Sequence, residues 1–224
     1  MPTPTVENYV KAIYELQRTS PEASAELVQL GRLATTLGVV PGTVTTMIRT
    51  LSDAHLVAYE PRVGVRLTPE GEQLALHVLR RHRVVESFLV KVLGLDWSEV
   101  HDEAEELEHV ISEKVLERMD ALLGRPRVDP HGDPIPDARG RIAEDEGRPL
   151  TSYSAGQAVT VTRVESRDAE FLRFLNASKL TPGTTLHVLR VDAQAGTLTL
   201  KVEGARQATS LSLTAAGRVM AAAV

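Results

Sequence analysis

The sequence predicts an α+β fold whose first half is helical and whose C-terminal part is a small β-barrel. Up to residue 124, apolar residues recur mostly at helical spacing, interrupted by one pair of short strand-like segments. From Gln157 onward, alternation with a period of two dominates. A stretch rich in Pro, Gly and charge lies between these parts. We therefore expect domains at 1–74, 75–124 and 151–224, with a linker at 125–150.

Composition limits the classes of protein to which the chain can belong. Its 224 residues can form one large domain or two small ones. The absence of cysteine excludes disulfides and thiolate metal sites, and it fits a cytoplasmic protein. There is no apolar run of about 20 residues and no visible signal peptide, so we expect no membrane partner. The net charge is −5, but residues 1–83 are roughly balanced, so a local basic face for nucleic acid can form there.

The N-terminal region has the pattern of a helix-turn-helix. Thr3 and Pro4 predict the N-cap and the first residue of an opening helix, which the polar stretch RTSPEAS ends. Two further helices are separated by a tight turn at Gly38, and Pro41 begins the second of them. Closely crossing helices joined by such a turn are typical of DNA-binding units. The expected inward residues are Leu30, Leu33, Ala34, Leu37, Val44, Met47, Ile48 and Leu51.

The outward face of that second helix is small, hydroxyl-rich and nearly free of acids, which suits contact with phosphates and base edges. Predicted strands at Leu56–Tyr59 and Val65–Leu67 form a hairpin, and Thr68-Pro69 caps the next helix, which completes the order of a winged helix. The alternative is an ordinary helical hairpin with a Thr-rich solvent face. The candidate DNA-contacting residues are Pro41, Gly42, Thr43, Thr45, Thr46 and Arg49 on the helix, with Arg62 and Arg66 on the wing.

Two predicted helices carry candidate metal ligands. A helix over Leu76–Gly94 places His82 and Glu86 one turn apart on its apolar face, and a helix over His101–Leu123 follows it. Imidazoles and carboxylates on a partly buried face are costly unless a cation satisfies them. A solvated acidic face with chance histidines is the alternative. On the first helix we expect Val78, Val85, Leu89 and Leu93 to be buried; on the second, His101, Glu105, Glu108 and His109 form one stripe, flanked by Ala104, Ile111 and Val115.

The C-terminal region predicts a barrel of about five strands. Alternating segments are QAVTVTRVE, TLHVLRVD and TLTLKVEG, and Asp168–Asn176 has the pattern of a short helix after the first of them. The chain has no HExxH helix, no Gly-rich phosphate loop and no GxSxG turn. An enzyme would therefore have to use the histidine-carboxylate cluster alone, as a metal-dependent hydrolase that activates water.

Several of these features together resemble the diphtheria-toxin-repressor family of metal-dependent bacterial regulators, which has iron-responsive and manganese-responsive branches. They are the winged helix, the His82/Glu86 pair, the stretch HDEAEELEH and the segment DPHGDPIP. The resemblance covers nearly the whole chain. It is strongest over Leu79–Leu95 and Val100–Val110, and weakest in the barrel, which is similar to the Src-homology-3-like domain of longer members.

The resemblance implies two metal sites per subunit. Iron-type members carry Met and Cys at two primary-site positions where this chain has Asn8 and Glu105, so it implies Mn(II), with Fe(II) as the other candidate. Members that pair two ions closely use a Glu where this chain has Lys11, whose ammonium cannot ligate, so we expect separated sites. The implied primary ligands are Asn8, Glu105, Glu108 and His109; the implied ancillary ligands are His82, Glu86 and His101, completed from the barrel by Glu170 or Asp168.

The function implied by the resemblance is that of a homodimeric, manganese-responsive DNA-binding repressor of metal-uptake genes, with an operator in double-stranded DNA and no organic ligand. Three alternatives stay open. The first is the metal-dependent hydrolase, and the second is an iron-responsive regulator of the same family. The third is a winged-helix regulator of another family that senses an organic ligand.

Overall fold

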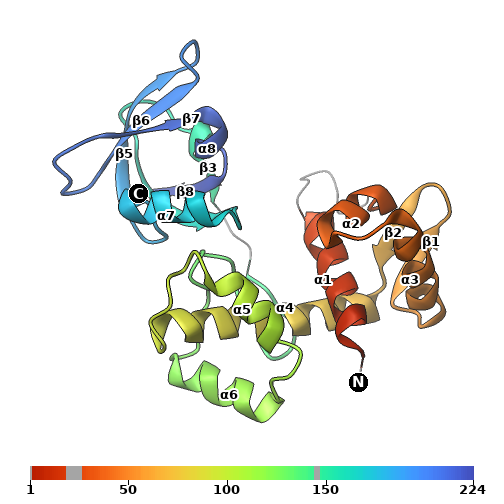
Figure 1. Cartoon of the computed structure of the whole chain (residues 1–224). Helices are drawn as coiled ribbons and strands as arrows, with labels where there is room; N and C mark the ends of the chain where they lie inside the picture. The colour runs from red at the N-terminus through yellow and green to blue at the C-terminus, as the bar shows by residue number, and fades with distance from the viewer. Residues whose placement is uncertain (1, 19–26, 144–146) are drawn as a thin grey trace. The chain divides into compact units, whose positions relative to one another are not determined.

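The computed structural model describes residues 2–18, 27–143 and 147–224 (Figure 1). Most of the predicted break RTSPEAS lies outside these residues. The chain divides into two compact units. The first contains Met1–His82, Glu108–Ile111 and Pro136–Arg141, and the second contains the remaining segments. No helix within the described ranges is long and apolar enough to cross a lipid bilayer.

The first unit is a winged helix-turn-helix, as predicted. Helix α1 (Pro4–Arg18) is followed by α2 (Leu30–Leu37) and α3 (Pro41–Asp53), and the hairpin pairs β1 (Val57–Glu60) with β2 (Gly64–Leu67) in antiparallel register. Gly38 has φ 64° and ψ 28°, a left-handed conformation that lets the chain turn sharply between α2 and α3. Figure 1 shows α2 and α3 beside this hairpin.

The core of the first unit joins α1, α2, α3 and the hairpin. The Thr3 hydroxyl accepts a hydrogen bond from the Val6 N–H at 3.4 Å, as expected of an N-cap. Each of the predicted inward residues is buried or packs against the core as a partly buried side chain. The buried side chains are Tyr9, Ala12, Ile13, Val28, Leu33, Ala34, Val44, Ile48, Leu51, Val57 and Val65.

A single long helix, α4 (Pro69–Lys91), follows the wing and contributes residues to both units. It begins as predicted, because the Thr68 hydroxyl accepts from the Gly71 N–H at 3.1 Å. The boundary expected between residues 74 and 75 falls inside this helix. Leu93, expected on its buried face, lies past its end and is 58% exposed, so that prediction was wrong.

The predicted continuous helix over His101–Leu123 was also wrong. The structure has α5 (Val100–Leu107) and α6 (Glu113–Leu122), separated by a turn that contains Glu108 and His109. Ser112 begins α6 as its N-cap, with its hydroxyl accepting from the Val115 N–H. Val115 is 46% exposed, so the apolar flank expected along one stripe does not continue into α6. Contacts of the turn residues within the first unit override the helix propensity of the sequence.

The second unit contains a six-stranded sheet in the order β3-β8-β4-β5-β6-β7. The three predicted strands and the short helix are present, and three further strands were not predicted. Register shifts in the β4–β8 and β5–β6 pairs bend the sheet around its core, to which Trp97 also belongs. The elements are β3 (Arg148–Pro149), η1 (Leu150–Ser152), β4 (Ala158–Val164), α7 (Ala169–Ala177), β5 (Thr185–Asp192), β6 (Thr197–Val202), β7 (Thr209–Ser212), α8 (Leu213–Ala216) and β8 (Val219–Ala223).

Part of the expected linker is a folded turn. Asp129, His131 and Ile135 are all buried. The His131 carbonyl accepts from the Val164 N–H of β4 at 2.9 Å. Gly132 has φ 90°, and a Cβ built on it would lie 2.0 Å from the Thr162 carbonyl oxygen. The turn is therefore packed directly against β4.

Candidate metal centre and nucleic-acid interface

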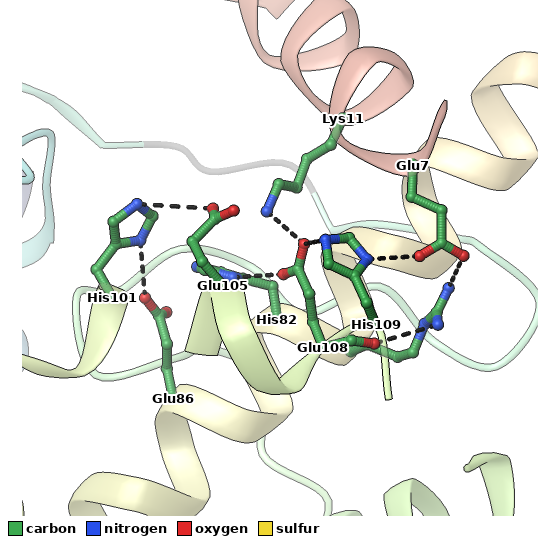
Figure 2. A network of polar contacts seen from close by, with 9 residues as sticks. Glu7, Lys11, His82, Glu86, His101, Glu105, Glu108 and His109 are labelled. Carbon is green, nitrogen blue, oxygen red and sulfur yellow. Dashed lines mark hydrogen bonds and ion pairs between the residues drawn. The ribbon is translucent and has the colours of Figure 1, made fainter. Parts of the chain in front are cut away.

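Glu108 is the centre of a buried polar network in the first unit (Figure 2). Its side chain is fully buried; its Oε1 lies 2.6 Å from the Lys11 Nζ and its Oε2 lies 2.6 Å from the His82 Nδ1. A carboxylate oxygen accepts, so His82 donates from Nδ1 and keeps the lone pair on Nε2. Glu108 thus joins α1 to α4 through a cation and an imidazole.

Glu7 makes a second junction in the same unit. It accepts from the Arg81 Nη2 at 2.7 Å and from the His109 Nδ1 at 2.6 Å. In the neutral imidazole, a proton on the Nδ1 of His109 leaves the lone pair on Nε2. A histidine that donates one ring N–H to a carboxylate and leaves the other nitrogen free has the arrangement found in most metal-ligating histidines.

Among the implied primary ligands, two buried acceptors have no hydrogen-bond donor among the described residues: the His109 Nε2 and the Asn8 Oδ1. The His109 Nε2 also lies 3.5 Å from the Glu108 Oε1. Adjacent ligands of one hexacoordinate ion lie about 3 Å apart. Buried acceptors without donors are costly, and a divalent cation would satisfy them. Asn8, Glu108 and His109 therefore fit the metal that the resemblance implies.

A second network lies in the second unit, around the buried Glu86. Its Oε1 lies 3.5 Å from the His101 Nδ1 and its Oε2 lies 3.8 Å from the His131 Nδ1. The His101 Nε2 lies 3.7 Å from the Glu105 Oε1 (Figure 2). Glu86, His131 and Asp129 each offer a donor atom within 4.8 Å of the others, a spacing suited to one ion. His82 lies one helical turn before Glu86 on α4.

His131 and Asp129 were not among the predicted ligands. The His131 Nε2 donates to the Trp97 carbonyl at 2.9 Å, and the two rings stack at 5.3 Å, which fixes the imidazole with Nδ1 toward Glu86. Asp129 Oδ1 accepts from the backbone N–H groups of His131 and Asp133. The signal that could have found them was the DPHGDPIP segment, in which a histidine alternates with two aspartates and whose low apolar content suggested a linker.

The ionisation of this turn is strongly perturbed. Burial lowers the pKa of His131, but the hydrogen bond and charge of Glu86, the charge of Asp129 and the Trp97 carbonyl together raise it to about 9. Burial, followed by the negative charges of Asp133 and Glu86, raises the pKa of the Asp129 carboxyl. Both shifts favour proton binding at this turn, where the Arg83 guanidinium also lies 3.6 Å from the Asp129 Oδ2 and 3.7 Å from the Asp133 Oδ1.

The two barrel candidates were expected to complete the ancillary site. Asp168 is the N-cap of α7, and its Oδ1 accepts from the N–H groups of Glu170 and Phe171. The side chains of Asp168 and Glu170 are both exposed. Within the described ranges, neither belongs to a group of three or more acidic or histidine side chains with donors inside 4.8 Å of one another.

The candidate DNA-contacting residues share the first unit with the Glu108 network. Thr45 is half-buried, and both it and Thr46 donate their hydroxyls to backbone carbonyls one turn back, at 3.0 and 3.1 Å, which leaves lone pairs on the outward surface. Arg62 stands at the tip of the β1–β2 hairpin with φ 68°. The predicted residues that are exposed are Pro41, Gly42, Thr43, Thr46, Arg49, Arg62 and Arg66.

Comparison with known sequences identifies three regions. Residues 1–65 match a family described as the iron dependent repressor, N-terminal DNA binding domain. Residues 68–137 match the iron dependent repressor, metal binding and dimerisation domain. Residues 148–222 match the FeoA domain.

Individual relatives agree with this division. The diphtheria toxin repressor of Corynebacterium glutamicum is 36% identical over 143 residues, which span 63% of this chain and 60% of that relative. The diphtheria toxin repressor of Corynebacterium efficiens is 30% identical over 196 residues, 83% of each chain. Among solved structures, a manganese-dependent transcriptional repressor in complex with manganese is 35% identical with a TM-score of 0.89, covering 98% of this chain and 100% of that one.

Proposed function

Because the chain belongs to the diphtheria-toxin-repressor family, we propose that it is a homodimeric, manganese-responsive repressor that binds operator DNA of metal-uptake genes. The observation that carries the metal dependence is that two buried acceptors of the implied primary set, Asn8 Oδ1 and His109 Nε2, have no donor among the described residues, and that the second of them lies 3.5 Å from the Glu108 Oε1. Members of this family are transcriptional repressors rather than enzymes, so the hydrolase alternative has no support.

In this proposal two sets of metal-ligating side chains each hold an ion. All of them are oxygen or imidazole nitrogen, and the chain has no thiolate, which favours Mn(II) over softer ions. Asp129 and His131 take the completing role in the ancillary set that the sequence alone assigned to Glu170 or Asp168. The primary set is Asn8, Glu105, Glu108 and His109; the ancillary set is His82, Glu86, His101, Asp129 and His131.

The proposed switch acts through α1. A divalent ion supplies a positive centre toward which neutral and anionic donors can converge. Asn8 lies on α1, whose other face packs against α2 and β2 in the core of the DNA-binding unit. When Asn8, Glu108 and His109 share one centre, α1 is held in one position, and the recognition helix α3 with it. A dimer reads two half-sites only at one separation of its recognition helices, so this restriction favours DNA binding.

The surface of α6 supports a homodimer. A groove of about 510 Å³ there is lined by apolar side chains and the stems of two basic residues. Leu122, in this groove, is 68% exposed in the single chain, and an exposed apolar patch of this kind favours a subunit interface. The lining residues are Phe88, Lys114, Val115, Arg118, Met119 and Leu122.

The test is selection of duplexes from a random-sequence DNA pool under anaerobic conditions, with Mn(II), Fe(II), Zn(II) or chelator in parallel. The expected result is retention of a defined sequence with saturating Mn(II), weaker retention when the other ions fill the sites because their preferred coordination geometry differs, and release by chelator. Equal retention with chelator would contradict metal dependence. Preferential retention with Fe(II) would assign the chain to the iron-responsive alternative.

A further inference from the structure

We propose that the Lys11 ammonium is a built-in competitor for the metal at Glu108. It holds this carboxylate in the metal-free protein and must leave before an ion can bind there, so it sets the metal concentration at which the protein responds. The proposal rests on the proposed function and names the residue that regulates its primary site.

The position of Lys11 is the first support. Its Nζ lies 2.6 Å from the Glu108 Oε1, the same oxygen that lies 3.5 Å from the free Nε2 of His109. An ion bridging that oxygen and that nitrogen would need the space at Oε1 that the ammonium fills. An ammonium has three N–H donors and no lone pair, so it cannot become a ligand of the ion that replaces it.

The charge of the network is the second support. Two carboxylates, Glu7 and Glu108, are paired with two basic side chains, Arg81 and Lys11. The buried side chains of Lys11 and Glu108 are 6% and 0% exposed, so little water screens the charges. A divalent ion added beside an unmoved Lys11 would meet strong repulsion. This repulsion is avoided if the divalent ion replaces the Lys11 ammonium at Glu108.

The two cation–carboxylate pairs have different roles. Glu7 orients His109 from the side opposite the free nitrogen, so Arg81 can keep its contact with Glu7 when metal binds. Lys11 contacts the oxygen that faces that nitrogen and cannot. Since Lys11 and Asn8 are both on α1, metal binding exchanges one link between α1 and Glu108 for another. The helix is attached in both states, and only its position differs.

The experiment measures Mn(II) affinity of the full-length protein by competition with a fluorescent chelator. The variants are Lys11→Met, which keeps an apolar stem, and Lys11→Arg, which keeps the charge. The control is Lys201→Met, an exposed lysine on β6. Lys11→Met should bind Mn(II) about tenfold more tightly or better, because a close like charge is removed. Lys11→Arg and the control should stay near the wild-type affinity.

A second readout separates this role from a structural one. The metal-free Lys11→Met protein should melt at a lower temperature than wild type, because it leaves a buried carboxylate without its cation. With saturating Mn(II), the two proteins should have the same melting temperature. Unchanged or weaker Mn(II) affinity in Lys11→Met would overturn the proposal. Wild-type protein that binds no Mn(II) at all would instead overturn the proposed function.

A third measurement uses wild-type protein alone and does not depend on how the variant folds. Lys11 is labelled with an amine-reactive reagent, with and without Mn(II), and followed by mass spectrometry. Displacement from Glu108 should raise the labelling rate of Lys11 when Mn(II) is bound, while Lys201 labels equally in both states. Equal labelling of Lys11 in both states would overturn the proposal.

Discussion

Glu7 decides which nitrogen of His109 is available to a metal. Its carboxylate accepts from Nδ1 at 2.6 Å and is itself held by Arg81. The lone pair on Nε2 therefore points away from Glu7 into a buried space where no described donor meets it. In the proposed metal centre, Glu7 and Arg81 would orient His109 without being ligands themselves.

The proposed preference for manganese depends on Glu105. Replacing it with Cys would add a thiolate, which favours Fe(II), Co(II) and Zn(II) over Mn(II). We expect Glu105→Cys to shift the ratio of Mn(II) to Co(II) midpoints for DNA binding by about tenfold, or about 1.4 kcal/mol of differential binding. The matched control is Glu103→Cys, an exposed position on the same helix. The midpoints are measured anaerobically, and an unchanged ratio would remove residue 105 from the ligand set.

His131 gives the metal-free protein a pH-dependent stability. Its pKa of about 9 in the folded protein exceeds the ordinary value of 6.5, because Glu86 and Asp129 outweigh burial. A group with a raised pKa contributes stability that is full below the unfolded pKa and is lost as pH rises through the folded one. The raised pKa of Asp129 acts in the same direction. In chelator, the melting temperature should therefore fall between about pH 6.5 and pH 9.

The matched variants for this prediction are His131→Gln and His187→Gln, the second at an exposed position on β5. His131→Gln should lower the melting temperature at pH 6.5 and flatten the fall toward pH 9. His187→Gln should retain the wild-type slope. A wild-type slope in both variants would show that His131 does not titrate in this range.

At the residue scale, the sequence predicted side chains whose chemistry is unambiguous and missed those defined by position. It singled out His82, Glu86, His101, Glu108 and His109 as candidate ligands because nearby imidazoles and carboxylates are visible in one dimension, although Glu108 and His109 lie in a turn rather than on the expected helical stripe. The partners Glu7 and Arg81 could not be found, because the pairs Glu7–His109 and Glu7–Arg81 join residues 102 and 74 positions apart. In the sequence, Lys11 was noted only because its ammonium cannot ligate a metal ion. Its contact with Glu108 is visible only in the structure.

At the element scale, helices with clear caps were predicted well. Thr3-Pro4, Gly38, Pro41 and Thr68 each begin or end a helix where expected. The break after α5 was missed because no Gly or Pro marks it. The N-cap at Ser112 is a local signal that could have revealed it, but Ser also occurs within helices. The long-range contacts of Glu108 and His109, which accompany this break, are not encoded in any local pattern.

The turn that contains His131 should depend on Gly132. An Ala there would place its Cβ 2.0 Å from the Thr162 carbonyl oxygen in addition to the strain of φ 90°. The matched control is Gly183→Ala, which has φ 88° but no atom within 4 Å of a built Cβ. Urea denaturation should show Gly132→Ala to be less stable than the control by about 2 kcal/mol or more. Equal destabilisation would mean that backbone strain alone matters and that the turn can leave β4 freely.

Helix α3 and the wing should share the contact with DNA. Arg49→Ala and Arg62→Ala should each weaken binding to the selected duplex and reduce the salt slope by about one unit for each phosphate that is no longer neutralised. The control is Arg206→Ala, at an exposed position of the C-terminal sheet domain. Fluorescence anisotropy over a series of KCl concentrations measures both quantities. If neither Arg49→Ala nor Arg62→Ala changes the DNA affinity or the salt slope, the DNA-binding surface lies elsewhere on the molecule.

At the scale of the whole molecule, the order of the parts was predictable and their division was not. The winged helix, the helical middle and the C-terminal sheet follow one another as expected. The division into units, however, assigns Glu108–Ile111 and Pro136–Arg141 to the N-terminal unit. Tertiary contacts bring these two segments back to the N-terminal unit. The composition of residues 125–150 indicates only that this stretch is polar. The buried turn at Asp129 and His131 was hidden for the same reason.

The central claim is that metal binding at the Glu108 network and DNA binding are thermodynamically coupled. The most direct test is to measure Mn(II) affinity with and without the selected duplex, and duplex affinity with and without Mn(II). If one equilibrium links the two sites, both ratios must be the same factor, and we expect it to be at least about tenfold. A Mn(II) affinity that is identical with and without DNA would contradict the account.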